Sequence, residues 1–388
     1  MTPRLKLLLL AALLTCAVSL PPAPAAQAAK GMELGVQDDS VFVIQLPHVG
    51  YRAKGLALAQ KLNVSWIRAN VGWSYVVNRY RNQKKEPKNI QYNWTGYDAL
   101  IAAASARGIH VQLALVGPAP AWATGNHKVG PVSPKAAAFR HFARAATEHF
   151  RGRVTRYSIW NEPNHRAWIS PIKNNAKIYR ALYTAGYSAI KTADPTVQVL
   201  IAETSPFDLG HGRNATSPLK FLRGVTCANA NYKKAGNCAP LQTDGYAHHP
   251  YDFGHKPAYR YPGKDNVTVA TLGRLTTALS KLHKAHLLTT PSGGTPQLFL
   301  TEYGYFASGK YKLPRSTQGK YLVQGFTIGQ RNPHVRQMVQ YLFVKPAGNF
   351  AFFDTSIATK AAKPTSAFNM LAAWAGKAAK AGQIAVAG

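Results

Sequence analysis

Short apolar runs rich in β-branched residues alternate along the chain with longer segments whose apolar positions recur every three or four residues. Eight runs have the length and composition of buried strands, at residues 32–37, 64–71, 109–116, 154–160, 197–203, 244–250, 296–302 and 335–344. Segments with helical spacing lie between them, among them residues 133–150, 174–194 and 268–286, and residues 363–380 supply a last such segment after the eighth run.

This alternation of strand and helix predicts an α/β fold, a single (β/α)8 TIM barrel. A doubly wound open sheet is the alternative, but no Gly-rich phosphate loop follows the first strand. The segment at 133–150 predicts a helix that begins with Ser133 as its cap and Pro134 in the first turn.

Residues 1–29 have the pattern of a secretory signal peptide. Arg4 and Lys6 precede an apolar stretch, and Ala26 and Ala28 form an A-x-A pattern. The apolar stretch is short for a membrane span and nothing comparable recurs, so we expect no membrane span. The mature part, residues 30–388, is expected to be one exported catalytic domain, secreted outside the cell or associated with the cell envelope.

Two cysteines, Cys227 and Cys238, remain after the signal peptide. In an exported chain this close pair is expected to form a disulfide, with two free thiols as the alternative. No Cys-x-x-Cys pair or His cluster accompanies them, so neither a metal site nor another cofactor is expected.

The chain is strongly basic. Residues 30–388 hold 45 Lys and Arg against 15 Asp and Glu, a formal net charge of +30. Such a charge attracts polyanions, which include acidic glycans, anionic envelope polymers, membrane surfaces and nucleic acid. Nucleic acid is not an expected partner, because no reading motif is present and the chain is expected to be exported.

Two scarce acids stand at predicted strand ends. Glu162 follows the fourth strand in IWNEPN, and Glu302 ends the seventh in LTEYGY. In a barrel both would face the mouth at the C-terminal ends of the strands. Two carboxylates across one pocket are what cleavage of a glycosidic bond requires. An ion pair with a barrel arginine is the structural alternative for either residue alone.

Five motifs in order carry a family resemblance: WIRANVGW, NWTGYDALIAAASARGIHVQLALVGPAPAWA, IWNEPN, DGYAHHPYD and LTEYGY. Over most of residues 30–388 the chain resembles the clan A retaining glycoside hydrolases. It is most similar to families 5 and 39, which hold cellulase-like enzymes, β-xylosidases and exopolysaccharide hydrolases.

The resemblance implies a role for each catalytic carboxyl. Glu162 would be the general acid/base, which needs a raised pKa, and Glu302 the nucleophile, which must be ionised. Arg68 would lie under Glu302 and keep it ionised. The two carboxyl groups of a retaining enzyme lie about 5 to 5.5 Å apart.

The resemblance also implies supporting contacts. Asn161 would hydrogen-bond the sugar 2-hydroxyl, and His249 and Tyr251 match the His-Pro-Tyr motif after the sixth strand, with the Tyr251 hydroxyl near Glu302. Phe343 and Lys345 stand at the predicted end of the eighth strand, where the related enzymes often carry a Trp that floors a sugar subsite.

Three tryptophans, Trp73, Trp122 and Trp168, fall in strand-end segments where sugar rings stack on indole faces, with ordinary core or rim packing as the alternative. Glu203 ends the fifth strand and is expected to bond a sugar hydroxyl or to pair with Arg213. His248 beside His249 does not predict a metal pair, because adjacent strand residues point to opposite faces.

These observations predict a secreted retaining glycoside hydrolase. It would cleave O-glycosidic bonds, β-linked by the resemblance, of a polysaccharide or oligosaccharide by double displacement. Basic residues in the loops after the second, sixth and seventh strands favour an acidic polysaccharide as substrate, whereas basic helices favour a charge that is general to the protein. The alternative function is a catalytically silent barrel that binds anionic cell-wall polymer.

Overall fold

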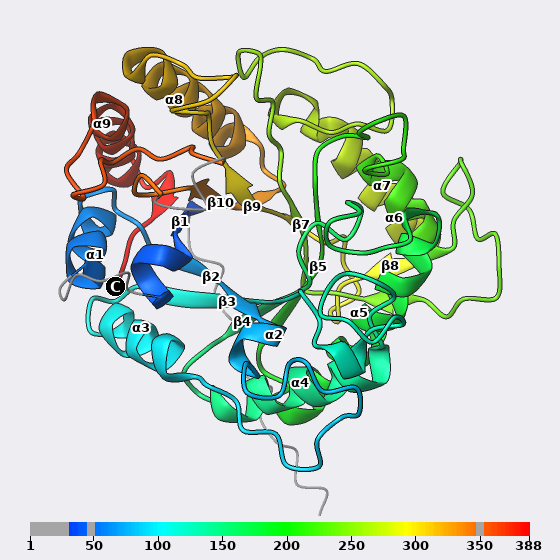
Figure 1. Cartoon of the computed structure of the whole chain (residues 1–388). Coiled ribbons are helices and arrows are strands. Elements are labelled where there is room, and N and C mark those ends of the chain that lie inside the picture. The colour runs from blue at the N-terminus through cyan, green and yellow to red at the C-terminus, as the bar shows by residue number, and fades with distance from the viewer. Residues whose placement is uncertain (1–30, 45–50, 347–352) are drawn as a thin grey trace, which may run out of the picture.

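The strands form a closed parallel barrel, as the sequence predicts. The computed structural model describes residues 31–44, 51–346 and 353–388 (Figure 1); the expected signal peptide lies outside them. The strand order is β10-β9-β7-β5-β4-β3-β2-β1, and β1 also pairs with β10, which closes the ring. The barrel strands are β1 (Met32–Gln37), β2 (Trp66–Gly72), β3 (His110–Val116), β4 (Arg156–Ile159), β5 (Gln198–Thr204), β7 (Gly245–His248), β9 (Leu298–Tyr303) and β10 (Val335–Tyr341).

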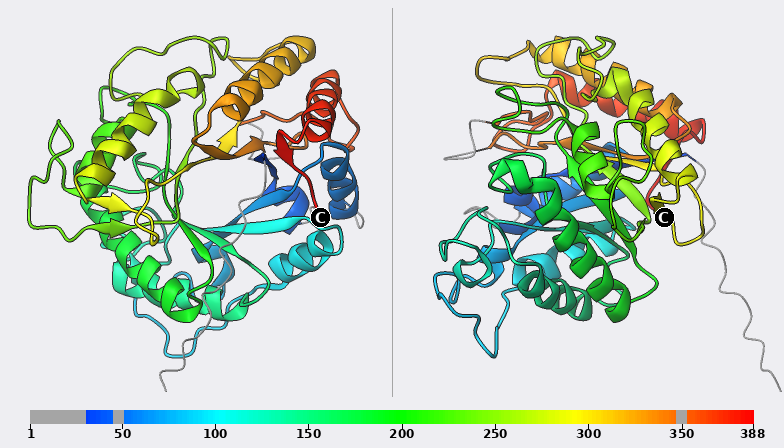
Figure 2. Two further views of the ribbon diagram at one scale, coloured as in Figure 1. Left: turned by 180° about the vertical axis from the view of Figure 1, so that it is seen from behind. Right: turned by 90° about the vertical axis from the view of Figure 1, so that its right-hand side faces the viewer.

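Helices surround this ring (Figures 1 and 2). They are α1 (Tyr51–Lys61), α2 (Trp73–Val76), α3 (Thr95–Ser105), α4 (Ala136–His149), α5 (Asn175–Ala193), α6 (Pro218–Thr226), α7 (Leu272–Lys284), α8 (Arg315–Arg331) and α9 (Ser366–Lys380). Helix α4 shows why they form, because Phe139, Phe142, Ala143 and Ala146 recur at helical spacing and are buried.

Shorter elements fill the connections. A π-helical turn spans Ser40–Ile44, and 3-10 turns span Ala121–Ala123, Ile172–Asn174 and Val269–Thr271. Strands β6 (Leu241–Gln242) and β8 (Leu288–Thr289) pair with each other, and β11 (Ile384–Ala385) pairs with β1.

Two predicted boundaries need correction. The eighth barrel strand ends at Tyr341, so Phe343 lies beyond it and is buried against Phe42 and Phe368. Helix α4 begins at Ala136 with Lys135 at the N-cap, and Ser133 lies outside it with a φ of 43°. Both errors arise because apolar pattern alone does not reveal where backbone pairing stops.

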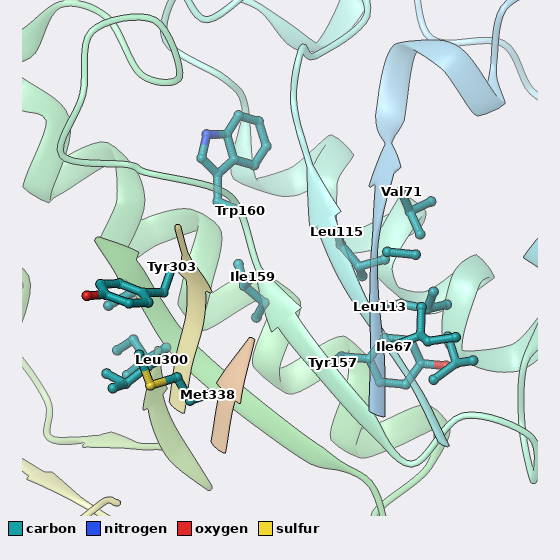
Figure 3. Close-up of a cluster of buried hydrophobic side chains, with 14 of the residues drawn as sticks. Ile67, Val71, Leu113, Leu115, Tyr157, Ile159, Trp160, Leu300, Tyr303 and Met338 are labelled. Carbon is teal, nitrogen blue, oxygen red and sulfur yellow. The ribbon is translucent and has the colours of Figure 1, made fainter. Parts of the chain in front are cut away.

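Apolar side chains between the strands and the helices form the main core. Figure 3 shows part of it, with labelled residues such as Ile67, Leu113, Ile159, Leu300 and Met338 from different strands, all of them buried. This packing fixes the strands, and the parallel topology gathers their C-terminal ends at one face of the ring.

A disulfide closes the segment after α6. Cys227 and Cys238 are bonded, 11 residues apart, as the sequence predicts. Cys227 adopts a left-handed backbone conformation at the end of the helix, with a φ of 51°. The bond therefore ties the end of α6 to the chain that leads into β6.

Candidate functional site

Arg68 is the centre of a buried polar cluster inside the barrel. It lies on β2, is 1% exposed, and its Nη1 donates to Oε1 of Glu302 at 2.9 Å and to the Gln37 side chain. Its Nη2 donates to Oδ1 of Asn161 at 3.0 Å and lies 3.3 Å from Oε2 of Glu203. One guanidinium thus holds side chains from four other strands or strand ends.

Burial disfavours the charge on Arg68, but the carboxylates of Glu203 and Glu302 outweigh this effect and raise its pKa. Arg68 is therefore a permanent cation, and its fork of donors fixes the carboxyl groups around it.

His249 follows β7 and lies between three carboxyl groups. Its Nδ1 is 3.1 Å from Oε1 of Glu162 and 3.6 Å from Oε2 of Glu302, and its Nε2 is 2.9 Å from Oε2 of Glu203. Burial opposes a charge on the ring, but Glu302, Glu162 and Glu203 together raise the pKa of His249 to about 10. At neutral pH both ring nitrogens carry protons and donate to carboxylates.

Glu302 lies on β9 and is 7% exposed. Besides Arg68, it accepts a hydrogen bond from the Tyr251 hydroxyl, whose oxygen lies 3.2 Å from Oε2. Burial raises the pKa of Glu302, and the nearby charges of His249 and Arg68 only partly offset this. Arg68 contacts Glu302 and lowers its pKa, as expected, but burial is the larger influence on this carboxyl group.

Glu162 is the most accessible of the three carboxyl groups. Its side chain is 21% exposed, whereas those of Glu203 and Glu302 are 0% and 9% exposed. The His249 Nδ1 distances of 3.1 and 3.6 Å limit the separation of Oε1 of Glu162 and Oε2 of Glu302 to about 6.7 Å. A solvent-facing and a buried carboxyl group therefore flank one charged imidazole.

Glu203 does not make the contacts expected of it. It is fully buried and accepts from Thr301 Oγ1 as well as from Arg68 and His249. Arg213, its expected partner, is exposed and donates through Nε to the carbonyl of Gly210 at 3.2 Å. Burial would raise the pKa of Glu203, but the charges of Arg68 and His249 lower it to about 2.

The backbone is strained where these acids enter the site. Trp160, Glu162, Ala202 and Glu203 have positive φ angles of 72°, 35°, 91° and 51°. The pairing of β5 with β7 shifts register between Ala202 and Thr204. Non-glycine residues hold such conformations only when surrounding contacts fix them, and such strain clusters at functional sites.

The three tryptophans differ in how deeply they are buried. Trp73 is 1% exposed and stacks on Phe142 at 5.4 Å, and Trp122 is 3% exposed. Both belong to the core, so the alternative of ordinary core packing is correct for these two residues and neither offers a face to a sugar ring. Trp168 is half-buried against the core, and its carbonyl accepts from Nε1 of Trp160 at 3.0 Å.

Three residues near the cluster were not anticipated. Gln37 ends β1 and accepts from Arg68; Asp39 follows it, and burial raises the pKa of this acid to about 6. Tyr341 ends β10, is partly exposed, and its pKa is raised first by burial and then by Glu302 and Asp39. The QDD run after the first strand was an available signal, because acids are scarce in this chain.

Tyr341 is the aromatic residue at the end of the eighth strand, a position that the sequence assigned to Phe343 and Lys345 because the predicted strand was too long. Lys345 is exposed beyond it. An aromatic ring therefore stands next to the cluster on this side.

No group of three or more metal-ligating side chains occurs among the residues that the structure describes. His248 points away from the cluster, with Nδ1 2.9 Å from Oγ1 of Thr204 and Nε2 3.0 Å from the carbonyl of Val267. Burial lowers the pKa of His248 to about 3, so its ring is neutral. Within the same residues, no helix has the length and apolar character of a membrane span.

Comparison with known proteins defines the fold. No family model and no curated protein matches the chain. Among solved structures, a family 39 glycoside hydrolase from Bacteroides cellulosilyticus WH2 matches with a TM-score of 0.63 and 17% identity, over 90% of this chain and 64% of that one. A monomeric β-xylosidase from Caulobacter crescentus CB15 matches with a TM-score of 0.56 and 17% identity, over 89% and 67%.

The virulence factor SghA from Agrobacterium tumefaciens matches with a TM-score of 0.56 and 13% identity, over 89% of this chain and 97% of that one. The chain therefore spans somewhat less than two thirds of the length of the Bacteroides structure and nearly all of SghA. At these identities the likeness establishes the barrel fold that these proteins share.

Proposed function

We propose that this chain is a secreted retaining glycoside hydrolase that cleaves β-glycosidic bonds by double displacement. The observation that carries the proposal is the convergence of Glu162 and Glu302 on His249 at the C-terminal ends of the strands. Active sites of (β/α)8 enzymes lie at this face. The pattern of residues 1–29 supports export.

The unequal environments of the two carboxyl groups support a division of roles. Glu162, which is partly exposed, would protonate the leaving oxygen, while an oxygen of Glu302 attacks the anomeric carbon and forms a glycosyl ester. Glu162 would then take a proton from water as that water attacks the ester and releases Glu302. Arg68 and Tyr251 would stabilise the carboxylate that departs.

The geometry favours retention of configuration. Retaining enzymes place their carboxyl groups about 5 to 5.5 Å apart, and inverting enzymes about 6.5 to 9.5 Å apart. The upper limit of about 6.7 Å between two oxygens covers the whole retaining range and only the edge of the inverting range.

Azide rescue tests the two roles on an activated aryl β-glycoside. Glu302→Ala should lose turnover and recover it with azide, yielding a glycosyl azide of inverted configuration. Glu162→Ala should instead yield a glycosyl azide of retained configuration. If Glu302→Ala yields a glycosyl azide of retained configuration, Glu302 is the acid/base and Glu162 the nucleophile. Full activity of both variants would refute the proposal.

We further propose that the substrate is an acidic polysaccharide. Among the described residues, 33 Lys and Arg are exposed but only three acids, Glu86, Glu148 and Asp208. Exposed cations occur in the loops at the mouth, such as Lys256 and Lys310, and also on the outer helices, such as Lys177. A polyanion would be attracted to the mouth and would meet cations wherever it continued over the surface.

The same charge supports the second candidate, a catalytically silent barrel that binds anionic cell-wall polymer. Release of reducing ends from neutral β-glucans, xylan and uronic-acid polymers separates the two, with Glu162→Gln as the inactive control. Hydrolysis of acidic polymers that disappears in the variant supports the glycosidase. Salt-sensitive binding by both proteins without hydrolysis of any polymer supports the silent barrel.

A further inference from the structure

Glu203 is the one carboxylate of the cluster that is sealed from solvent, and the proposed reaction gives it no role. Its side chain is 0% exposed, so it is closed to the substrate. Its Oε2 accepts from Nε2 of His249 at 2.9 Å and lies 3.3 Å from Nη2 of Arg68. The Thr301 hydroxyl on β9 also donates to Oε2.

The backbone of Glu203 contacts Glu162 directly. The amide of Glu162 donates to the carbonyl of Glu203 at 2.9 Å. Both residues have positive φ angles, and the register shift of β5 falls at Glu203. The irregular end of β5 thus turns the side chain into the barrel and points the carbonyl toward the end of β4.

His249 is the link from Glu203 to the catalytic pair. With Nε2–H donating to Glu203, the opposite ring nitrogen faces Oε1 of Glu162 and Oε2 of Glu302. A ring held by one strong charge-assisted hydrogen bond cannot flip without breaking it. The orientation of Nδ1–H therefore depends on a residue that touches neither reacting atom.

We infer that Glu203 is a positioning residue, which holds His249 as a donor between Glu162 and Glu302 and fixes the backbone of Glu162. The expected effect on kcat rests on the proposed function, whereas the expected effect on the titration of His249 does not. His249 would keep a positive charge beside both carboxyl groups through the whole reaction. It would thereby stabilise the carboxylate of Glu162 that forms when Glu162 has protonated the leaving oxygen, and the carboxylate of Glu302 that departs from the glycosyl ester.

The charged and titratable groups around His249 come from several strands. Those that interact with it or with its carboxylate partners include Asp39 after β1, Arg68 on β2, Glu162 after β4, Tyr179 on α5, Glu203 on β5, His248 and Tyr251 at and after the end of β7, Glu302 on β9 and Tyr341 at the end of β10. Among them, Glu203 supplies the contact to Nε2. Loss of its charge should make His249 release a proton more readily, since the pKa of His249 is raised to about 10 by the three carboxylates.

The test is the Glu203→Gln variant, which keeps the shape of the side chain and removes its charge. Histidine nitrogens are labelled with ¹⁵N, and His249 is assigned with a His249→Asn variant. In the parent protein His249 should stay doubly protonated to about pH 9, and in Glu203→Gln its midpoint should fall by about 1 to 3 pH units. An unchanged midpoint overturns the inference, whether or not the protein cleaves a glycoside.

Kinetics supply the second readout. Glu203→Gln should lower kcat about 10- to 100-fold with little change in KM, because the substrate does not touch Glu203. The kcat of the variant should also fall further as pH rises through the new His249 midpoint. A loss confined to KM, or a pH profile parallel to that of the parent, would contradict a positioning role.

Two further variants complete the design. Glu203→Asp keeps the buried charge but has a shorter side chain, and it serves as the test if Glu203→Gln does not fold. If kcat and the His249 titration are both unchanged in Glu203→Asp, the inference is overturned as well. Glu86→Gln is the matched control, because Glu86 pairs with Nδ1 of His141 at the same 2.9 Å on the surface. It should leave kcat and the His249 titration unchanged.

Discussion

A buried ion pair at the opposite end of the barrel tests how burial changes the contribution of an ion pair to the free energy of unfolding. Glu33 on β1 accepts two hydrogen bonds from Arg156 on β4, at 2.7 and 3.2 Å, and its Oε1 lies 2.9 Å from Arg336. Arg156 is 2% exposed and its guanidinium lies 3.8 Å from the centre of the Trp66 ring. Glu33→Ala would leave this buried cation with only amide acceptors.

The size of the effect follows from that loss. Breaking a buried pair by removing one partner costs about 3 to 5 kcal/mol. A chain of roughly 360 residues has an unfolding entropy of about 0.75 kcal/mol/K, so the expected fall in Tm is about 4 to 7 °C. Activity below the transition should be unchanged, because Glu33 lies at the start of its strand, away from the site.

Thermal unfolding followed by circular dichroism measures this fall, and the surface provides a matched control. Glu148 pairs with Arg144 on α4 at the same 2.7 Å, but the two side chains are 45% and 64% exposed. Glu148→Ala should cost only about 0.3 to 0.5 kcal/mol. Equal losses of unfolding free energy in Glu33→Ala and Glu148→Ala would refute the reasoning. A double variant, Glu33→Ala with Arg156→Met, removes the unpaired buried cation, so it would also refute the reasoning if it were less stable than Glu33→Ala alone.

Three further outcomes are expected. Because burial raises the pKa of Glu302, kcat/KM should decrease on the acid side of the pH profile with a midpoint above the ordinary glutamate pKa of 4.5. Arg68→Met removes a charge that lowers this pKa, so it should move that midpoint to a still higher pH. A midpoint at lower pH would contradict the assignment of Glu302 as the nucleophile. Replacing Cys227 and Cys238 by Ser should cost about 3 kcal/mol of unfolding free energy from the 11-residue loop, measured by urea unfolding, and a reductant should then have no further effect. Trp73→Ala should cost about 3 to 5 kcal/mol because Trp73 is buried, yet leave the KM for oligosaccharides unchanged; a raised KM would return Trp73 to the substrate.

The barrel was predictable because its signals are local and repeated. Each strand is a short apolar run, and the first strand occupies the predicted residues, Met32–Gln37. The proximity of Glu162 and Glu302 was predictable because a scarce charge directly after or within an apolar run stands out, and because parallel strands bring such ends together. Glu162 and Glu302 are 140 residues apart in the sequence, so only the barrel topology predicts that they lie close together.

The role of Glu203 could not be read in the same way. The sequence placed it at a strand end, but its inward direction depends on the irregular pairing of β5 with β7. That pairing is a property of two strands and not of either run of residues. Burial of Trp73 likewise depends on the packing of α4, whose Phe142 stacks on it, because an indole ring in a strand-end segment has the same sequence pattern in the core and at the rim.

The scarcity of acids acquires a physical meaning once the structure is known. Three of the 15 acids are exposed, and two of these, Glu86 and Glu148, already face a His or an Arg. The remaining acids are buried or half-buried, where an ionised carboxylate is tolerated only with cations or hydrogen-bond donors beside it. An outer surface with so few carboxylates repels cationic molecules and attracts anionic ones, while carboxylates gather around Arg68 and His249 inside the barrel. The same charge distribution is what the proposed function requires, because a cationic surface attracts an anionic polymer while the carboxyl groups proposed for catalysis are kept in one interior site.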